Sequence, residues 1–173
     1  MPKKMTPVLS RAEIAEKVKN LAEQISRDYG EKDFCVIGIL KGAFVFMADL
    51  VRELPDSIQI DFVRVASYGS ETVSSGNVQI TKDLEIDIEG QDVLVVEDIV
   101  DSGITIAWFL KHLKKFNPRS MKVCAFIDKT ERRQVQVPID YVGHVVDQGF
   151  LVGYGLDFDE KYRGLPEVYE IET

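Results

Sequence analysis

Three short and almost unbroken apolar runs constrain the fold of this chain more than any other feature. They are FCVIGIL at residues 34–40, VLVV at residues 93–96 and MKVCAFI at residues 121–127. Strands buried on both faces of a parallel sheet have this composition, whereas strands with one exposed face alternate apolar and polar residues. Because helical patterns follow the first two runs, the sequence predicts an α/β fold with an open, twisted, mainly parallel sheet flanked by helices.

The helices and outer strands are predicted from periodicity and from end signals. Ser10 and Glu13 form a capping-box pattern, and an apolar face with spacings of four, three and four follows as Ile14, Val18, Leu21 and Ile25. Further helices are expected at residues 41–54 and 104–116. Residues 57–67 alternate as a strand does, residues 68–77 form a polar loop rich in Ser and Gly, and residues 77–83 return as a strand.

Composition and charge set the broad class. The 173 residues are 45% hydrophobic and 29% charged, which is typical of one soluble globular domain spanning residues 1–173. The sequence has no apolar run long enough to span a membrane and no signal-peptide pattern, so we expect a cytoplasmic protein without a membrane partner. A net charge of −8 disfavours general binding of nucleic acid. His112 lies among lysines, which indicates a solvated helix surface.

Acidic residues gather where the second buried run ends. Glu97, Asp98 and Asp101 fall at the carboxyl end of this strand, the edge at which open parallel sheets bind ligands. The following turn, residues 102–105, opens a helix, and the N–H groups at a helix N-terminus bind phosphate well. Carboxylates accept hydrogen bonds from sugar hydroxyls or hold Mg²⁺. A phosphorylated sugar with Mg²⁺ fits this pattern better than a helix cap made of three acids.

Two other uses of clustered acids were weighed. An apolar strand that ends in Glu-Asp occurs in NTPases, but these also need the motif G-x-x-x-x-G-K-[ST]. The sequence lacks it, because Lys41 precedes Gly42 and no Ser or Thr follows. In phospho-acceptor receiver domains the acids come from separate strands. Both readings are disfavoured.

The stretch VLVVEDIVDSGIT, residues 93–105, resembles the phosphoribosyl-pyrophosphate (PRPP) binding motif of type I phosphoribosyltransferases. Four further parts of the chain resemble the 6-oxopurine branch of that family. They are Leu40-Lys41-Gly42, Ser67-Tyr68-Gly69, Asp128-Lys129-Thr130, and residues 149–157 with 162–165. The resemblance runs from about residue 8 to residue 171.

The resemblance implies a fold, a reaction and partners. The fold is that of type I phosphoribosyltransferases, with a flexible loop at about residues 68–77. A base-binding hood is expected mainly from residues 128–173 together with the N-terminal segment. The implied enzyme uses Mg²⁺ to transfer phosphoribosyl from PRPP to N9 of hypoxanthine or guanine, which gives IMP or GMP and pyrophosphate. A homodimer or homotetramer is implied. The choice among hypoxanthine, guanine and xanthine stays open.

The resemblance also assigns roles to the acids and to the turn. Asp101 is the expected general base, which takes the N7 proton as N9 attacks. Glu97 and Asp98 are expected to hold the ribose hydroxyls, directly or through Mg²⁺. The PRPP site, with the 5′-phosphate at the turn, comprises Glu97, Asp98, Asp101, Ser102, Gly103, Ile104 and Thr105. Some relatives carry a basic or another residue in place of Ile104, so only its backbone N–H is expected to contribute.

The remaining roles concern pyrophosphate, the purine and a second Mg²⁺. Pyrophosphate is expected to contact Lys41, Gly42, Arg163, Ser67 and Tyr68. The purine is expected to contact Lys129 through O6, Phe150 by stacking, the Leu151 backbone and Asp157, which would also bind metal. Each role has a structural alternative: Lys129 solvated, Phe150 in the core, or Asp157 and Arg163 paired with each other. The Leu40–Lys41 peptide is often cis in the family.

Overall fold

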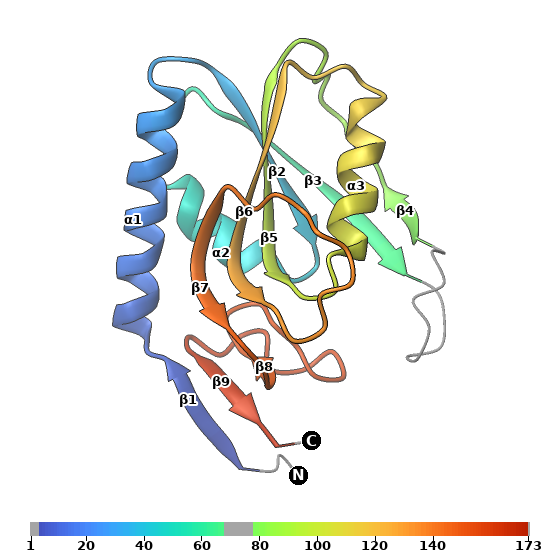
Figure 1. Cartoon of the computed structure of the whole chain (residues 1–173). Helices are drawn as coiled ribbons and strands as arrows, with labels where there is room; N and C mark the ends of the chain where they lie inside the picture. Colours follow the sequence, from blue (N-terminus) through green and yellow to red (C-terminus); the bar gives the residue numbers. More distant parts are fainter. Residues whose placement is uncertain (1–3, 68–77, 173) are drawn as a thin grey trace.

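The computed structural model describes residues 4–67 and 78–172, which form two sheets and three helices (Figure 1). Along the chain the elements are β1 (Met5–Leu9), α1 (Arg11–Tyr29), β2 (Phe34–Leu40), α2 (Phe44–Val51), β3 (Gln59–Ser67), β4 (Val78–Lys82), β5 (Asp92–Val100), α3 (Ile104–Lys114), β6 (Ser120–Lys129), β7 (Tyr141–Val146), β8 (Phe150–Val152) and β9 (Val168–Ile171). Among the described residues no helix is both long and apolar enough to cross a membrane.

The larger sheet has the strand order β4-β3-β2-β5-β6-β7, and only β4 runs antiparallel to its neighbour. Helices α1 and α2 cover one face and α3 covers the other (Figure 1). Side chains of β5 alternate between the two cores: Leu94 and Val96 pack towards α1 and α2, whereas Val93 and Val95 pack towards α3. The predicted α/β fold with a mainly parallel sheet is confirmed.

Local signals explain where the helices begin and end. The Ser10 hydroxyl accepts from the Glu13 N–H at 3.2 Å, and the Glu13 carboxylate accepts from the Ser10 N–H at 2.7 Å, so the capping box forms and α1 ends at Gly30. Helix α2 is shorter than the predicted 41–54, because residues 41–43 form a turn after β2. The Leu40–Lys41 peptide bond in this turn is cis.

The topology places a crevice between β2 and β5. These strands are neighbours, but the chain leaves β2 for β3 on one side and leaves β5 for β6 on the other. Such a switch point separates the loops at the carboxyl ends of the two strands and leaves room for a ligand between them. The turn after β2 and the acidic end of β5 therefore face each other.

The smaller sheet has the antiparallel order β1-β9-β8 and lies beyond the carboxyl ends of β5 and β6 (Figure 1). It joins the beginning of the described chain to its end, since Met5 pairs with Ile171 and Pro7 with Tyr169. Strand β8 carries Phe150 and Leu151 next to β9. The small sheet thus places the first and last described strands side by side, next to β8.

Three predictions about β5 and α3 were wrong in detail. Strand β5 continues to Val100, so it ends later than expected, and Glu97 and Asp98 lie before its last residues. Helix α3 ends at Lys114, two residues earlier than predicted. The His112 side chain is only 17% exposed, because it stacks on Trp108 and lies 3.3 Å from the Asp83 carboxylate, so it is not a solvated surface residue.

Candidate active site

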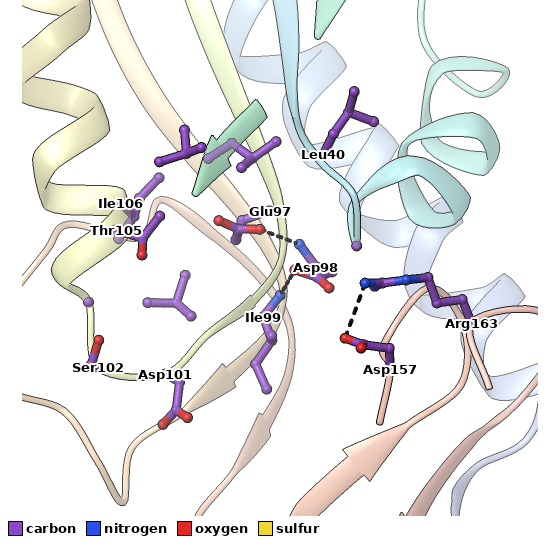
Figure 2. A pocket seen from close by; sticks show the side chains of 15 residues that line it. Leu40, Glu97, Asp98, Ile99, Asp101, Ser102, Thr105, Ile106, Asp157 and Arg163 are labelled. Carbon is purple, nitrogen blue, oxygen red and sulfur yellow. Dashed lines mark hydrogen bonds and ion pairs between the residues drawn. The ribbon is translucent and has the colours of Figure 1, made fainter. Parts of the chain in front are cut away.

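A cavity of about 280 Å³ opens at the carboxyl ends of β2 and β5 (Figure 2). Of the residues singled out in the sequence, it brings together Gly42, Glu97, Asp98, Asp101, Ser102, Gly103, Thr105, Asp157 and Arg163. Its walls come from the end of β2 with the turn after it, from Val65 of β3, from the stretch that joins β5 to α3, and from the segment before β9. A single site therefore collects groups from four separate parts of the chain.

Glu97 and Asp98 are neighbouring carboxylates in this cavity. The Glu97 side chain accepts from the Asp98 N–H at 3.3 Å, and the Asp98 side chain accepts from the Ile99 N–H at 2.8 Å (Figure 2). Burial and then the charge of Asp98 raise the pKa of Glu97 well above its ordinary value. Burial also raises the pKa of Asp98, and the nearby Arg163 opposes this rise. A cation in the cavity, or hydroxyl groups that donate hydrogen bonds, would reduce the repulsion between the Glu97 and Asp98 carboxylates.

Asp101 lies at the mouth of the cavity directly after β5. Its Oδ2 atom lies 3.8 Å from Nζ of Lys129, while its Oδ1 atom is buried and has no hydrogen-bond partner among the described residues. Buried carboxylate oxygens usually have a partner, so Oδ1 is a free acceptor that a ligand would satisfy. Lys129 is only 7% exposed, so it is not a solvated surface lysine.

The turn between β5 and α3 depends on a glycine in the left-handed conformation. Gly103 has φ +84°, and a Cβ atom there would lie 2.4 Å from the carbonyl oxygen of Val135, so only glycine fits. The Ser102 hydroxyl accepts from the Ile104 N–H at 3.2 Å. The expected Ile104 donor is therefore already bonded within the turn, while Thr105 lines the cavity in the first turn of α3.

Gly42 forms the opposite wall. A Cβ atom at this position would lie 1.8 Å from Oδ2 of Asp98, so the absence of a side chain allows the β2 turn to approach the β5 carboxylates. Lys41 does not line the cavity. Its Nζ lies 2.7 Å from Oε2 of Glu160, and both side chains are largely exposed.

Arg163 is the cation of the cavity wall and has three partners. Its Nη2 atom lies 3.2 Å from Oδ1 of Asp157 and 3.3 Å from Oε1 of Glu160, and its Nη1 atom donates to the Gly155 carbonyl at 2.8 Å. Figure 2 shows the pair of Arg163 and Asp157. Asp157 and Arg163 are therefore paired with each other, as the alternative to ligand-binding roles expected, and both still line the cavity.

Of the expected purine contacts, only Asp157 lines the cavity; Lys129, Phe150 and Leu151 do not. Phe150 is half-buried and packs edge to face against Phe158, with ring centroids 5.5 Å apart. Leu151 is buried and follows it in β8. Ser67 is the last residue of β3. Tyr68 and the 68–77 loop lie outside the described residues.

The comparisons with known proteins agree with this arrangement. Residues 7–159 match the family model described as a phosphoribosyl transferase domain. The chain belongs to the phosphoribosyltransferase family.

Relatives in this family are similar over nearly the whole chain. A hypoxanthine-guanine phosphoribosyltransferase of Aquifex aeolicus is 46% identical, covering 98% of this chain and 96% of that protein. The Bacillus subtilis protein of the same name is 42% identical, with 93% and 89% covered. A crystal structure of a hypoxanthine-guanine phosphoribosyltransferase from Bacillus anthracis is 42% identical with a TM-score of 0.93, covering 99% of this chain and 100% of that one. The expected phosphoribosyltransferase fold is confirmed.

Two residues that contact the candidate site, Glu160 and Arg133, are not indicated by the sequence pattern. Glu160 contacts both Lys41 and Arg163, and Arg133 binds the ends of β5 and β6. Neither follows from periodicity or from a motif. Glu160 stands in the acidic stretch DFDE, and Arg133 is next to an exposed arginine, Arg132, from which the sequence does not distinguish it.

Proposed function

We propose that this protein is a purine-salvage enzyme that transfers the 5-phosphoribosyl group from PRPP to N9 of hypoxanthine or guanine. The products are IMP or GMP and pyrophosphate. The observation that carries the proposal is the cavity in which Glu97, Asp98 and Asp101 lie beside the turn formed by residues 102–105. The names of the similar proteins from Aquifex aeolicus and Bacillus subtilis support the 6-oxopurine substrate class.

PRPP would lie across the crevice between β2 and β5. The 5′-phosphate would bind at residues 102–105, where the N-terminus of α3 contributes partial positive charge and Ser102 and Thr105 contribute hydroxyls. The ribose hydroxyls would donate to Glu97 and Asp98, whose carboxylates are held in place by backbone N–H groups. The pyrophosphate would then reach Gly42 and Arg163, with Lys41, Ser67 and Tyr68 as further contacts.

In the reaction N9 attacks C1′ while the bond from C1′ to pyrophosphate breaks. Negative charge grows on the leaving group, and Arg163 and Lys41 would stabilise it. Positive charge grows on the ribose ring near Glu97 and Asp98. The N7 proton of the purine would pass to Asp101, whose Oδ1 has no other partner among the described residues.

The purine would lie between Phe150 and the end of β6. Lys129, held 3.8 Å from Asp101, would donate to the purine O6, and the Leu151 backbone would bind the base edge. Asp157 would lie near the base and a second metal ion. A 6-oxo group is favoured because an adenine amino group offers Lys129 no equivalent acceptor. Hypoxanthine, guanine and xanthine share that oxygen, so Lys129 does not rank them.

Mg²⁺ fits the carboxylates of Glu97 and Asp98. The described residues contain no group of three or more His, Cys, Asp or Glu side chains arranged to hold a metal by themselves. Mg²⁺ commonly binds one or two carboxylates and completes its shell with water and substrate oxygens, so this pair suffices. When bound, Mg²⁺ would offset charge on the pyrophosphate.

The domain organisation, cellular location and assembly of the protein are also proposals. We propose that residues 1–173 act as one catalytic domain and that the small sheet, together with residues from 128 onwards, covers the purine. The protein would work in the cytoplasm as a homodimer or homotetramer, with no nucleic-acid or membrane partner.

The test is a coupled assay of the purified protein with PRPP and Mg²⁺. We expect turnover with hypoxanthine or guanine, little with adenine, and loss of turnover when a chelator removes Mg²⁺. Separate kcat/KM values for hypoxanthine, guanine and xanthine would establish the preferred base. Absence of turnover with every 6-oxopurine would refute the proposal.

A further inference from the structure

Arg133 is a partly buried arginine in the segment after β6, outside the walls of the cavity. Its side chain is 11% exposed. The Nε atom donates to the carbonyl oxygen of Asp101 at 2.8 Å, and Nη2 donates to the carbonyl oxygen of Val100 at 3.2 Å. The guanidinium donors form a rigid planar fork, so these two contacts fix the main chain where β5 ends.

The same guanidinium also binds the end of β6. Its Nη2 atom donates to the carbonyl oxygen of Lys129 at 3.1 Å and to the carboxylate of Asp128. The Asp128 side chain is 19% exposed, and its negative charge compensates the positive charge of the partly buried Arg133 guanidinium. Arg133 thereby joins the main chain of Asp101 to the main chain of Lys129.

Residues next to Arg133 hold the phosphate turn from the same side. The carbonyl oxygen of Ser102 accepts from the N–H groups of Gln134 and Val135 at 2.9 and 3.1 Å. A Cβ atom on Gly103 would also approach Cδ of Arg133 at 3.2 Å. Residues 133–135 therefore bind the main chain of both Asp101 and Ser102.

We infer that Arg133 is a positioning residue for the transfer step, and that it sets the orientation of the Asp101 carboxylate relative to the Lys129 ammonium group. The inference rests on the roles proposed for Asp101 and Lys129. The direction of the Asp101 side chain depends on the peptide groups beside it, and Arg133 binds the carbonyl oxygens of residues 100 and 101. Misplacing a reacting group by about 1 Å costs about 100-fold in rate.

The test variant is Arg133→Lys, which keeps the positive charge beside Asp128 but lacks the planar fork. We expect kcat to fall about 10- to 100-fold, while KM for PRPP changes less than about threefold. Arg132→Lys is the matched control, because Arg132 is the exposed neighbour. It should keep the wild-type kcat.

A double-mutant cycle separates positioning from a general structural role. If Arg133 acts through Asp101, then Arg133→Lys should lower kcat less than about threefold in an Asp101→Asn background, measured with radiolabelled hypoxanthine. Equal losses in both backgrounds, or an unchanged kcat in Arg133→Lys alone, would overturn the inference. Wild-type turnover in the same assay tests the proposed function separately.

Asp128→Asn covers the case in which Arg133→Lys does not fold, as judged by thermal unfolding. This variant removes the charge that anchors the guanidinium and keeps a hydrogen-bond acceptor. We expect kcat to fall at least about threefold, with the same dependence on Asp101. Wild-type kcat in a folded Asp128→Asn protein would then overturn the inference.

Discussion

Lys41 and Glu160 are joined by an ion pair of 2.7 Å, although 119 residues separate them along the chain. Glu160 also lies 3.3 Å from Arg163, so one carboxylate contacts both cations expected to bind pyrophosphate. The Lys41 hydrogen bond is the main cause that holds the pKa of Glu160 below its ordinary value, so the carboxylate stays charged at neutral pH. To bind Lys41 and Arg163, pyrophosphate would have to displace the Glu160 carboxylate from both cations.

Glu160→Gln should therefore bind pyrophosphate more tightly than the wild type. Because an exposed ion pair is weak, we expect an inhibition constant for pyrophosphate only about two- to fivefold lower. Asp159→Asn is the control, since it removes the same charge from the neighbouring exposed residue, which lies 3.5 Å from Lys161. Unchanged or weaker pyrophosphate inhibition in Glu160→Gln would contradict this competition.

Asp101→Asn tests the proton transfer. The amide keeps the size of the side chain but cannot accept the N7 proton, so we expect kcat to fall about 10²- to 10⁴-fold. The dissociation constant for PRPP should change less than about threefold. Glu131→Gln is the control, because Glu131 also lies near Lys129, at 3.9 Å, and has no proposed catalytic role. Comparable losses in kcat and in PRPP affinity would argue against a general base.

Gly42→Ala tests the close approach of the two loops. Its Cβ atom would lie 1.8 Å from the Asp98 carboxylate, so either the turn after β2 or Asp98 must move. We expect kcat/KM for PRPP to fall at least about tenfold, as for other displaced catalytic groups. Gly164→Ala is the control, since a Cβ atom there meets nothing within 4 Å. Wild-type kinetics in Gly42→Ala would show that this contact is not needed.

Glu97→Gln tests the raised pKa of Glu97. Because the folded protein holds the Glu97 proton more tightly than the unfolded chain, this group favours folding at low pH and loses that contribution as pH rises through the raised pKa. The variant should be more stable than the wild type at about pH 8, with a Tm at least about 3 °C higher. The difference should vanish near pH 4, close to the ordinary pKa of a glutamate.

Calorimetry without ligands measures this effect, and Glu16→Gln on the exposed side of α1 is the control. A pH-independent difference, or a less stable Glu97→Gln protein at about pH 8, would contradict the raised pKa.

Much of the sheet and the place of the site could be predicted from the sequence. Runs such as residues 93–96 exclude water on both faces, and Glu97 and Asp98 then fall at a predictable edge. The end of β5 could not be predicted, because its pairing with β6 depends on main-chain hydrogen bonds that polar side chains do not prevent. The burial of Lys129 depends in the same way on tertiary neighbours.

Contacts between segments that are distant along the chain could not be predicted from the sequence either. Nothing in the local pattern distinguishes Arg133 from Arg132, since burial of one of them depends on where β5 and β6 end. The partner of Lys41 depends on a segment more than 100 residues later. The burial of His112 has a similar cause, because the lysines beside it in the sequence do not indicate its contact with Asp83.

The pairing order of the small sheet has a consequence for protein synthesis. Strand β9 is its central strand and pairs with both β1 and β8, so neither outer strand has a partner in this sheet until residues 168–171 exist. Strand β1 precedes the other described elements along the chain, so it has no partner in this sheet until β9 has been translated. A ribosome that stops before residue 168 would release a chain whose large sheet has its described strands but whose small sheet cannot form.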